Sequence, residues 1–215
     1  MKLYVYDHCP FCVRARMPFG LKAIPFELHF QLNDDEETPI SMIGQKMLPI
    51  LEDDDGFMGE SLDIVHKLDS LSGERIFAGE PSTAITDWIS RWGSVMNGLV
   101  IPRTPDAVFP EFRTAEARAY FTRKKEAQFG RFDELLAQTD DLIARLRPGL
   151  NELEAILPDA EHPSIDDILL FPLLRGLSIV AGLTLPPKAT AYRARMAERA
   201  GVPLVDDLRA AAAAQ

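Results

Sequence analysis

The sequence predicts an α/β domain followed by an all-α domain. One observation is a strand–helix–strand pattern within residues 3–32. Another is a series of further short patterns, in the order βαβ(α)ββα, that ends near residue 72. The third is that the pattern beyond the turn residues at 79–82 is helical throughout. We therefore expect an α/β domain over residues 1–72, a linker over residues 73–83 and an all-helical domain over residues 84–215.

Two runs of apolar residues predict the first two strands. Residues 3–6 are continuously apolar or aromatic, which indicates a strand covered on both faces and therefore central in the sheet. Residues 26–32 alternate between apolar and polar side chains, which is typical of a half-exposed strand nearer an edge. The helix between them carries Val13, Met17 and Leu21 on one face, so the three elements form a right-handed βαβ unit.

The rest of the first domain is predicted from turn and cap residues. Residues 39–45 suggest a short helix, and residues 48–51 suggest a strand that opens with Leu48-Pro49. A proline has no N–H to donate to the sheet, so it must lie at the start or edge of that strand. Asp53-Asp54-Asp55-Gly56 predicts a hairpin turn. We expect Ser61 to be the N-cap of a following amphipathic helix.

Four segments predict the helical domain. Residues 85–99 step by three and four, and residues 114–146 contain one or two helices. A capping-box variant, Ser164-x-x-Asp167, precedes a buried apolar helix, and residues 192–200 form a polar outer helix. We expect Trp88, Trp92 and the apolar helix to cover apolar side chains of the first domain in a fixed contact between the domains.

Composition and charge exclude several classes of function. The chain has 23 basic and 33 acidic residues, a net charge of −10, which argues against binding to nucleic acid or to an anionic membrane surface. Residues 168–185 carry one charge, Arg175, near their centre, and Pro172 interrupts them. A helix buried in a bundle explains this stretch better than a membrane span. The first eight residues reach a charged turn too early for a signal peptide, so we expect a reducing cytoplasm.

Cys9-Pro10-Phe11-Cys12 contains the only two cysteines of the chain, between the first strand and the first helix. Unpaired N–H groups and the helix dipole favour a thiolate at Cys9, and Cys12 lies one turn further on. A structural zinc site needs a second ligand pair, which is missing, and a disulfide across four residues constrains little of the unfolded chain. Two inert buried thiols are the remaining alternative. Thiol–disulfide exchange is the interpretation we favour.

Several motifs taken together make the sequence resemble a known protein family. The Cys9–Cys12 motif, Leu48-Pro49 opening a strand and Glu60-Ser61 opening a helix resemble the glutathione-binding pattern of the thioredoxin superfamily. The helical second half with Ser164-x-x-Asp167 is similar to the glutathione-transferase architecture. With Tyr6-Asp7-His8 before an intact C-P-aromatic-C, nearly the whole chain resembles the bacterial glutaredoxin 2 family. Phe11 stands where tyrosine is commoner, and the lysine that usually precedes the motif in small glutaredoxins is absent.

This resemblance implies a thioredoxin-like domain with a mixed four-stranded sheet, joined to a helical bundle. It implies a glutaredoxin, an oxidoreductase of cell redox homeostasis, whose Cys9 attacks mixed disulfides of glutathione with proteins. The resulting Cys9–glutathione disulfide would be resolved by a second glutathione or by Cys12. It also implies a monomer that uses glutathione and no metal. The glutathione-binding residues that it implies are Pro10, Phe11, Leu48, Pro49, Glu60 and Ser61.

Some of these residues have specific expected roles. A cis bond before Pro49 would present the backbone of Leu48 to glutathione as an added strand. The Ser61 hydroxyl and the helix behind it would bind the γ-glutamyl carboxylate, and Glu60 would bind the amine. A glutathione transferase that conjugates electrophiles, and a noncatalytic regulatory module of the same fold, are the alternative functions.

The charged residues near the motif are less informative. We expect Arg14 and Arg16 to form a solvated helix face, and Arg123-Lys124-Lys125 to form another. His8, when protonated, would favour the Cys9 thiolate, although a simple loop histidine is equally consistent with the sequence.

Overall fold

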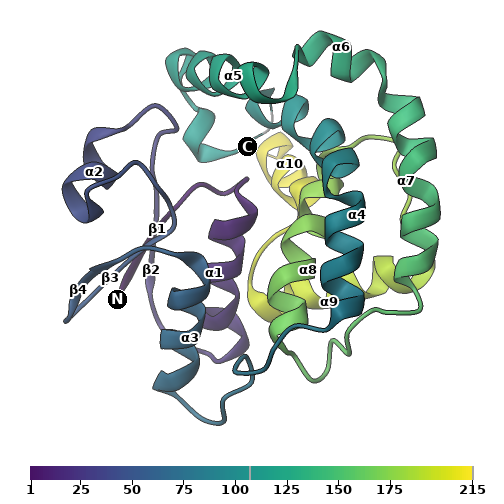
Figure 1. The fold of residues 1–215 in the computed structure, drawn as a ribbon. Helices are drawn as coiled ribbons and strands as arrows, with labels where there is room; N and C mark the ends of the chain where they lie inside the picture. Colours follow the sequence, from purple (N-terminus) through teal and green to yellow (C-terminus); the bar gives the residue numbers. More distant parts are fainter. Residues whose placement is uncertain (107, 215) are drawn as a thin grey trace.

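The computed structural model describes residues 1–106 and 108–214, and its two halves meet mainly at α1 (Figure 1). The first half consists of β1 (Lys2–Val5), α1 (Pro10–Leu21), β2 (Glu27–Phe30), α2 (Glu37–Ile43), β3 (Ile50–Asp53), β4 (Gly56–Met58) and α3 (Ser61–Leu71). The second half consists of α4 (Thr83–Val100), η1 (Ile101–Asp106), η2 (Pro110–Phe112), α5 (Ala115–Phe129), α6 (Phe132–Ala137), α7 (Thr139–Leu153), α8 (Ile165–Gly176), η3 (Leu177–Ile179), α9 (Pro187–Ala200) and α10 (Val205–Ala213). The predicted fold class, a mixed-sheet thioredoxin-like domain followed by a helical domain, is confirmed.

The sheet has the strand order β2-β1-β3-β4. β1 runs parallel to β2, with Leu3 opposite Leu28, and antiparallel to β3, with Leu3 opposite Leu51. The strand order confirms that the first strand is central and the second lies at an edge. The predicted cover on both faces of β1 is wrong: Leu3 and Val5 share one face and are completely buried, whereas Lys2 and Tyr4 on the opposite face are only partly buried.

Two predicted element starts in the first half are wrong by two residues each. The short helix α2 begins at Glu37, before the predicted 39–45, because the Asp35 carboxylate accepts the N–H of Thr38 and starts the turn early. β3 begins only at Ile50, after Pro49, which has no N–H for the sheet. The Leu48–Pro49 bond is cis, as predicted.

The predicted N-cap of α3 is also wrong. Ser61 is the first residue of the helix, and Glu60 occupies the cap position. The φ of Glu60 is +63°, which turns the chain from β4 into α3 within two residues. Ser61 is buried within the first turn of the helix.

The helical half contains more helices than predicted. Residues 114–146, expected to hold one or two, belong to α5, α6 and α7, and the chain leaves α5 at Gly130 with a φ of +94°. The capping box at the start of α8 is confirmed, since the Ser164 N–H donates to the Asp167 carboxylate at 2.8 Å. Within residues 1–106 and 108–214, no helix has both the length and the apolar character to cross a membrane.

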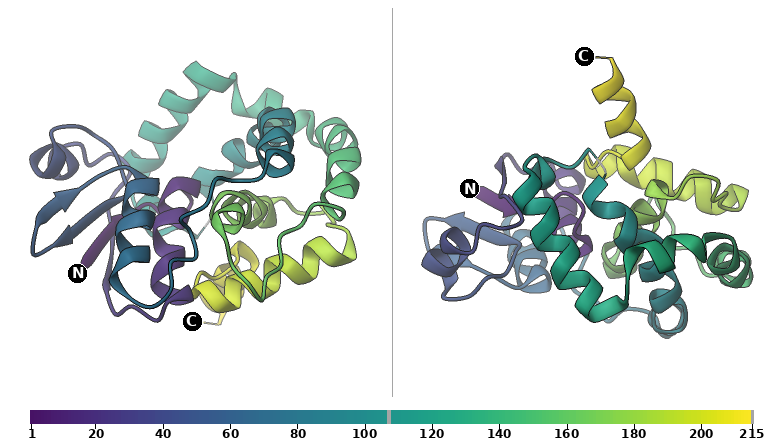
Figure 2. Two further views of the ribbon diagram at one scale, coloured as in Figure 1. Left: turned by 60° about the horizontal axis from the view of Figure 1, so that its bottom comes forward. Right: turned by 90° about the horizontal axis from the view of Figure 1, so that it is seen from above.

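The two halves share an apolar contact, as predicted. α1 and α3 lie on the face of the sheet toward the helical half, and α8 and α9 pack against α1 (Figure 2). Met17 and Val65 belong to the same buried apolar cluster as the helical bundle. At Gly20, α1 approaches α9 so closely that an added Cβ would lie 2.1 Å from the Ala200 carbonyl oxygen.

The contact uses only part of what was predicted: the apolar helix α8 does pack against α1, but the two tryptophans pack against α7. The Trp88 indole donates to the Gly149 carbonyl at 2.7 Å, and Trp92 packs on Gly149, so both tryptophans fill the space between α4 and α7. The expected polar outer helix, α9, instead contacts α1 and buries Tyr192 and Met196. The tryptophan prediction failed because an amphipathic face shows that a helix is covered but does not show by which neighbour.

Candidate active site

Both cysteines lie where the first strand passes into the first helix. Cys9 is the N-cap of α1, and Pro10 is its first residue. Proline fits this position well because its missing N–H would have no partner there. The Cys9 side chain is half-buried, whereas Cys12 is completely buried behind it, and the Tyr6 N–H donates to the Cys12 sulfur at 3.4 Å. Both thiols are free.

The two thiols differ in acidity. Hydrogen bonding from the Cys12 thiol lowers the pKa of Cys9 to about 6, with further help from His8 and from the N–H groups of Phe11 and Cys12, although burial opposes the shift. Burial, together with the proton that it shares with Cys9, raises the pKa of Cys12 well above that of an ordinary thiol. At neutral pH, Cys9 is therefore a thiolate and Cys12 a protonated thiol.

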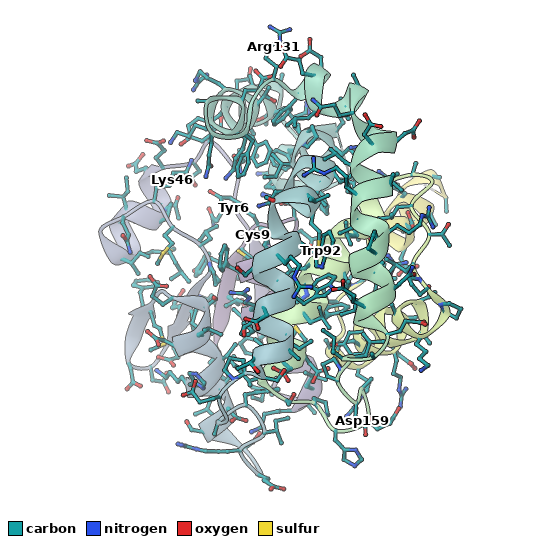
Figure 3. The ribbon with its side chains drawn as sticks, turned by 45° about the vertical axis from the view of Figure 1, so that its right-hand side comes forward. Tyr6, Cys9, Lys46, Trp92, Arg131 and Asp159 are labelled. Carbon is teal, nitrogen blue, oxygen red and sulfur yellow. The ribbon has the colours of Figure 1, made fainter. Side chains whose placement is uncertain are left out.

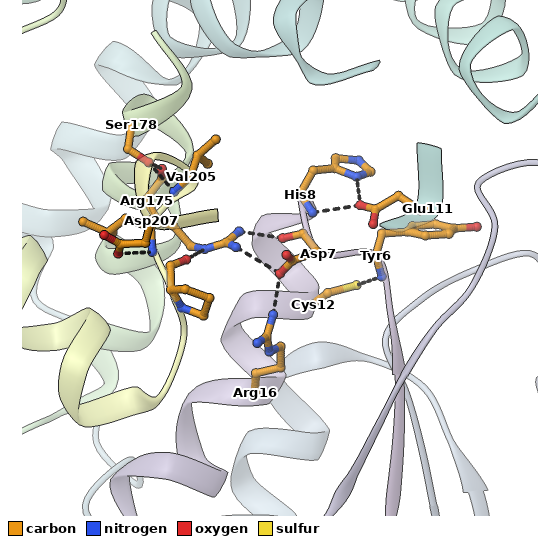
Figure 4. A network of polar contacts seen from close by, with 12 residues as sticks. Tyr6, Asp7, His8, Cys12, Arg16, Glu111, Arg175, Ser178, Val205 and Asp207 are labelled. Carbon is orange, nitrogen blue, oxygen red and sulfur yellow. Dashed lines mark hydrogen bonds and ion pairs between the residues drawn. The ribbon is translucent and has the colours of Figure 1, made fainter. Parts of the chain in front are cut away.

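A buried ion cluster ties the cysteine motif to the helical half (Figure 4). The Asp7 carboxylate accepts from Arg16 of α1 and, at 2.9 Å, from Arg175 of α8. Arg175 also donates to the backbone carbonyl of Asp7 at 2.6 Å. All three side chains are buried, so the predicted solvated face is wrong for Arg16. Arg16 is covered because the helical half lies over this side of α1.

His8, the residue before Cys9, is held by a second contact with the helical half. Glu111 of η2 is completely buried, and its Oε1 accepts the His8 backbone N–H at 2.9 Å and contacts His8 Nδ1 at 2.6 Å. Hydrogen bonding and the charge of His8 hold the pKa of Glu111 below its usual value, although burial opposes this. His8 is therefore fixed in orientation, which a simple loop histidine would not be.

Two hollows of about 320 Å³ each open beside Cys9. The first, which we call the helical-side hollow, has mostly apolar walls from α4, α5 and α8, together with His8, Pro10 and Phe11. The second, which we call the lysine-side hollow, lies between Tyr6 and Leu48 on one side and α5 on the other. Three lysines line it, Lys46 from the sheet half and Lys124 and Lys125 from α5. Figure 3 shows Tyr6 and Cys9 at the boundary between the two halves, with Lys46 on the sheet half.

The structure brings together most of the predicted site residues. Cys9, Pro10 and Phe11 line the helical-side hollow, and Leu48 lines the lysine-side hollow directly before Pro49. Glu60 and Ser61 lie at the start of α3 and line neither hollow. Four of the eight predicted residues therefore line the two hollows, and two more, Cys12 and Pro49, directly follow lining residues in the chain.

Several residues at the site were not predicted. Lys125, expected on a solvated face, lines both hollows, and Glu111 and Arg175 fix the segment before Cys9. Glu111 lies 103 positions from His8, and Arg175 lies 168 positions from Asp7. The sequence carries no signal for pairs so far apart. Among the described residues, no group of three or more histidine, cysteine or carboxylate side chains is arranged to hold a metal ion.

Two family models match the chain. Residues 3–76 match the glutathione S-transferase N-terminal domain, and residues 84–209 match the glutaredoxin 2 C-terminal domain. Glutaredoxin 2 of Escherichia coli strain K12 is 47% identical over 213 residues, which cover 97% of this chain and 99% of that protein.

Solved structures are also similar to this chain. The crystal structure of glutaredoxin 2 from Salmonella typhimurium in complex with glutathione is 47% identical, has a TM-score of 0.92 and covers 96% of this chain and 97% of that one. A glutathione transferase of Phanerochaete chrysosporium is 15% identical with a TM-score of 0.65, covering 94% of this chain and 98% of that one. This second likeness shows a shared fold alone.

Proposed function

The chain belongs to the glutaredoxin 2 family, and from this premise we propose that Cys9 and Cys12 are the redox pair of a glutathione-dependent thiol–disulfide oxidoreductase. The observation that carries this assignment is the contrast between the two thiols. Cys9 is half-buried, lines both hollows and has a pKa of about 6, whereas Cys12 is completely buried and stays protonated. An accessible thiolate beside a protonated thiol is suited to attack followed by resolution.

The reaction begins when the Cys9 thiolate attacks the glutathione sulfur of a mixed disulfide. The bond between glutathione and the substrate thiol breaks, and a Cys9–glutathione disulfide forms. A second glutathione then attacks this disulfide, which releases glutathione disulfide and restores the Cys9 thiolate. For a substrate with an internal disulfide, Cys12 resolves the intermediate and a Cys9–Cys12 disulfide results.

The lysine-side hollow is the proposed glutathione site. Leu48 lies on one wall with Cys9 beside it, so that an extended peptide on the Leu48 backbone would place its sulfur near Cys9. Lys46, Lys124 and Lys125 supply positive charge suited to the carboxylates of glutathione. Pro10, Phe11 and Pro49 complete the proposed contacts around the sulfur. Glu60 and Ser61 remain proposed partners of the γ-glutamyl group, because α3 begins there with free N–H groups.

The test compares two single variants with a glutathione mixed disulfide of a peptide as substrate. Cys9→Ser is expected to abolish turnover, because the nucleophile is removed. Cys12→Ser is expected to retain substantial turnover of the mixed disulfide but to lose the reduction of internal disulfides. Equal loss in the two variants would reject the proposed roles.

A glutathione transferase is the second candidate, because the first half matches the transferase N-terminal domain model. A transferase activates the sulfur of glutathione itself and does not need Cys12. Conjugation of glutathione to a chloronitroaromatic electrophile therefore separates the two functions. We expect little conjugation and rapid turnover of the mixed disulfide.

The remaining proposals concern the domain boundaries, the oligomeric state and the cellular location. Residues 1–72 form the redox domain, residues 73–83 the linker and residues 84–215 the helical domain. The protein acts as a monomer on glutathionylated or disulfide-containing proteins, and its place is the cytoplasm, where reduced glutathione is available. Size-exclusion chromatography with light scattering tests the monomer, and a second species at twice the mass would contradict it.

A further inference from the structure

We propose that His8 is a catalytic residue of the exchange reaction, carrying protons for the thiols that leave and enter at Cys9, and that Glu111 is the residue that positions it. This inference rests on the proposed function, because it assigns a role within thiol–disulfide exchange. It also gives the helical half a chemical role, since Glu111 belongs to η2 and His8 belongs to the segment before α1.

The geometry resembles that of an oriented general acid–base. The buried Glu111 carboxylate contacts Nδ1 of His8 at 2.6 Å and also holds the His8 backbone at 2.9 Å. A carboxylate on one ring nitrogen fixes both the tautomer and the orientation of an imidazole. The other nitrogen, Nε2, has no hydrogen-bond partner in the part of the chain that the structure describes. His8 lines both hollows beside Cys9, so Nε2 is the ring nitrogen available to a substrate.

Aromatic side chains hold the imidazole in place. The Tyr6 ring stacks on His8 with centroids 5.8 Å apart, and Phe109, Phe112 and Phe121 surround it at 5.1 to 6.0 Å. Such packing leaves the ring little freedom to rotate. A side chain that only filled space would not need a completely buried carboxylate beside it, because burying that charge is costly.

The chemistry also needs a proton carrier. When Cys9 attacks, the substrate thiol leaves as a thiolate, and the charged form of His8 gives it a proton. His8 is then neutral and takes the proton of the incoming glutathione thiol, which becomes a thiolate. That thiolate attacks the Cys9–glutathione disulfide, glutathione disulfide leaves, and both the Cys9 thiolate and the charged His8 are restored. Imidazole suits this exchange because it gains and loses a proton near neutral pH.

The test uses two substrates that differ in their need for a proton. In the mixed disulfide of glutathione with 2-mercaptoethanol, the leaving alkyl thiolate must be protonated. In the mixed disulfide with thionitrobenzoate, the leaving aromatic thiolate is stable as an anion. The release of each thiol is measured in a single turnover at pH 7, with the reduced full-length protein in excess.

His8→Gln is expected to slow release of the alkyl thiol about tenfold or more, and release of the aromatic thiol by no more than about twofold. Glu111→Gln is expected to show the same selectivity with a smaller loss. Since Glu111 acts through His8, the double variant H8Q/E111Q should lose no more than His8→Gln alone. In His8→Gln the buried Glu111 carboxylate loses its imidazole partner, which could disturb folding. The double variant removes that carboxylate as well, so it keeps the test valid if His8→Gln misfolds.

A matched control makes the same substitution at another histidine that contacts a carboxylate. His162 Nδ1 contacts the Asp159 carboxylate at 2.9 Å and His162 lines neither hollow, so His162→Gln removes such a contact without touching the site around Cys9. It is expected to leave both rates unchanged. Equal slowing of the two substrates in His8→Gln, or no slowing of either, would overturn the inference. If the native protein released neither thiol, the proposed function itself would fail.

Discussion

Gly20 lies where α1 meets the end of α9 with no room for a side chain. A Cβ at this position would lie 2.1 Å from the carbonyl oxygen of Ala200 and 2.9 Å from its Cα. Both are backbone atoms, so no side-chain rotation relieves the overlap. The substitution Gly20→Ala must therefore push the two halves of the molecule apart, or distort one of the two helices.

The size of the effect follows from this overlap. A carbon–oxygen contact requires about 3.3 Å, so α1 and α9 must separate by roughly 1 Å. A gap of that size forfeits a quarter to a half of the attraction across the contact. Overpacking of this kind costs about 1–3 kcal/mol, and the better helix propensity of alanine returns up to about 1 kcal/mol. We expect a net loss of about 2 kcal/mol in the free energy of unfolding, which lowers Tm by about 4–8 °C.

Urea unfolding followed by circular dichroism measures this loss. Gly93→Ala is the matched control, because Gly93 also lies inside a helix, α4, but a Cβ there would meet nothing within 4 Å. The control is expected to be neutral or stabilised by up to about 1 kcal/mol. If Gly20→Ala were as stable as the native protein, the close approach of α1 to α9 would be refuted.

The remaining predictions concern the cysteines and the buried ion cluster. Alkylation of Cys9 by iodoacetamide is expected to reach half its maximum rate near pH 6 and to fall below that pH as the thiolate gains a proton; a midpoint above pH 8 would contradict it. Cys12→Ala removes the hydrogen bond that lowers this pKa most, so the same titration should move to higher pH, and an unchanged midpoint would show that Cys12 has no such role. Arg175→Met is expected to cost up to about 3 kcal/mol in urea unfolding, because Asp7 stays buried with one partner fewer. The exposed Arg195 provides the control, since Arg195→Met should cost less than about 1 kcal/mol, and similar losses in both would argue against a strong buried cluster. Equilibration with glutathione buffers should give the Cys9–Cys12 pair a potential of roughly −200 to −230 mV, whereas a value near the thioredoxin figure of about −270 mV would contradict the glutaredoxin assignment.

Local patterns in the sequence predicted the features that depend on local structure. The apolar and aromatic run of β1 correctly indicated a central strand, although only one face of β1 is fully buried, and alternation in the next run correctly indicated an edge. The position of Cys9 at the start of α1 was predicted from its place between an apolar run and a helical pattern, and Pro10 in the first turn agrees with it. The accessible and buried roles of Cys9 and Cys12 follow from the same placement.

The features that the sequence did not predict depend on contacts between distant segments. Arg16 looked solvated because arginine on a helix surface usually is, yet α8 brings Arg175 and α1 brings Arg16 to the same carboxylate. The partners of Trp88 and Trp92 depend on the crossing of α4 with α7, which periodicity does not specify. The observed start of α2 differs from the predicted one by two residues, because a single side-chain contact, that of Asp35 with Thr38, decides where the helix begins.

The position of α8 and α9 in the chain has a consequence for synthesis on the ribosome. α1 is complete at Leu21, but the helices that cover it begin only at Ile165 and Pro187. At a translation rate of about 5–20 residues per second, the apolar face of α1 stays uncovered for on the order of ten to thirty seconds before α8 and α9 are synthesised. During this interval Met17 has no helical bundle to pack against, and Asp7 lacks the guanidinium of Arg175. The nascent first half is therefore a natural client for chaperones that bind exposed apolar segments, and the redox site is finished only when the last third of the chain has emerged.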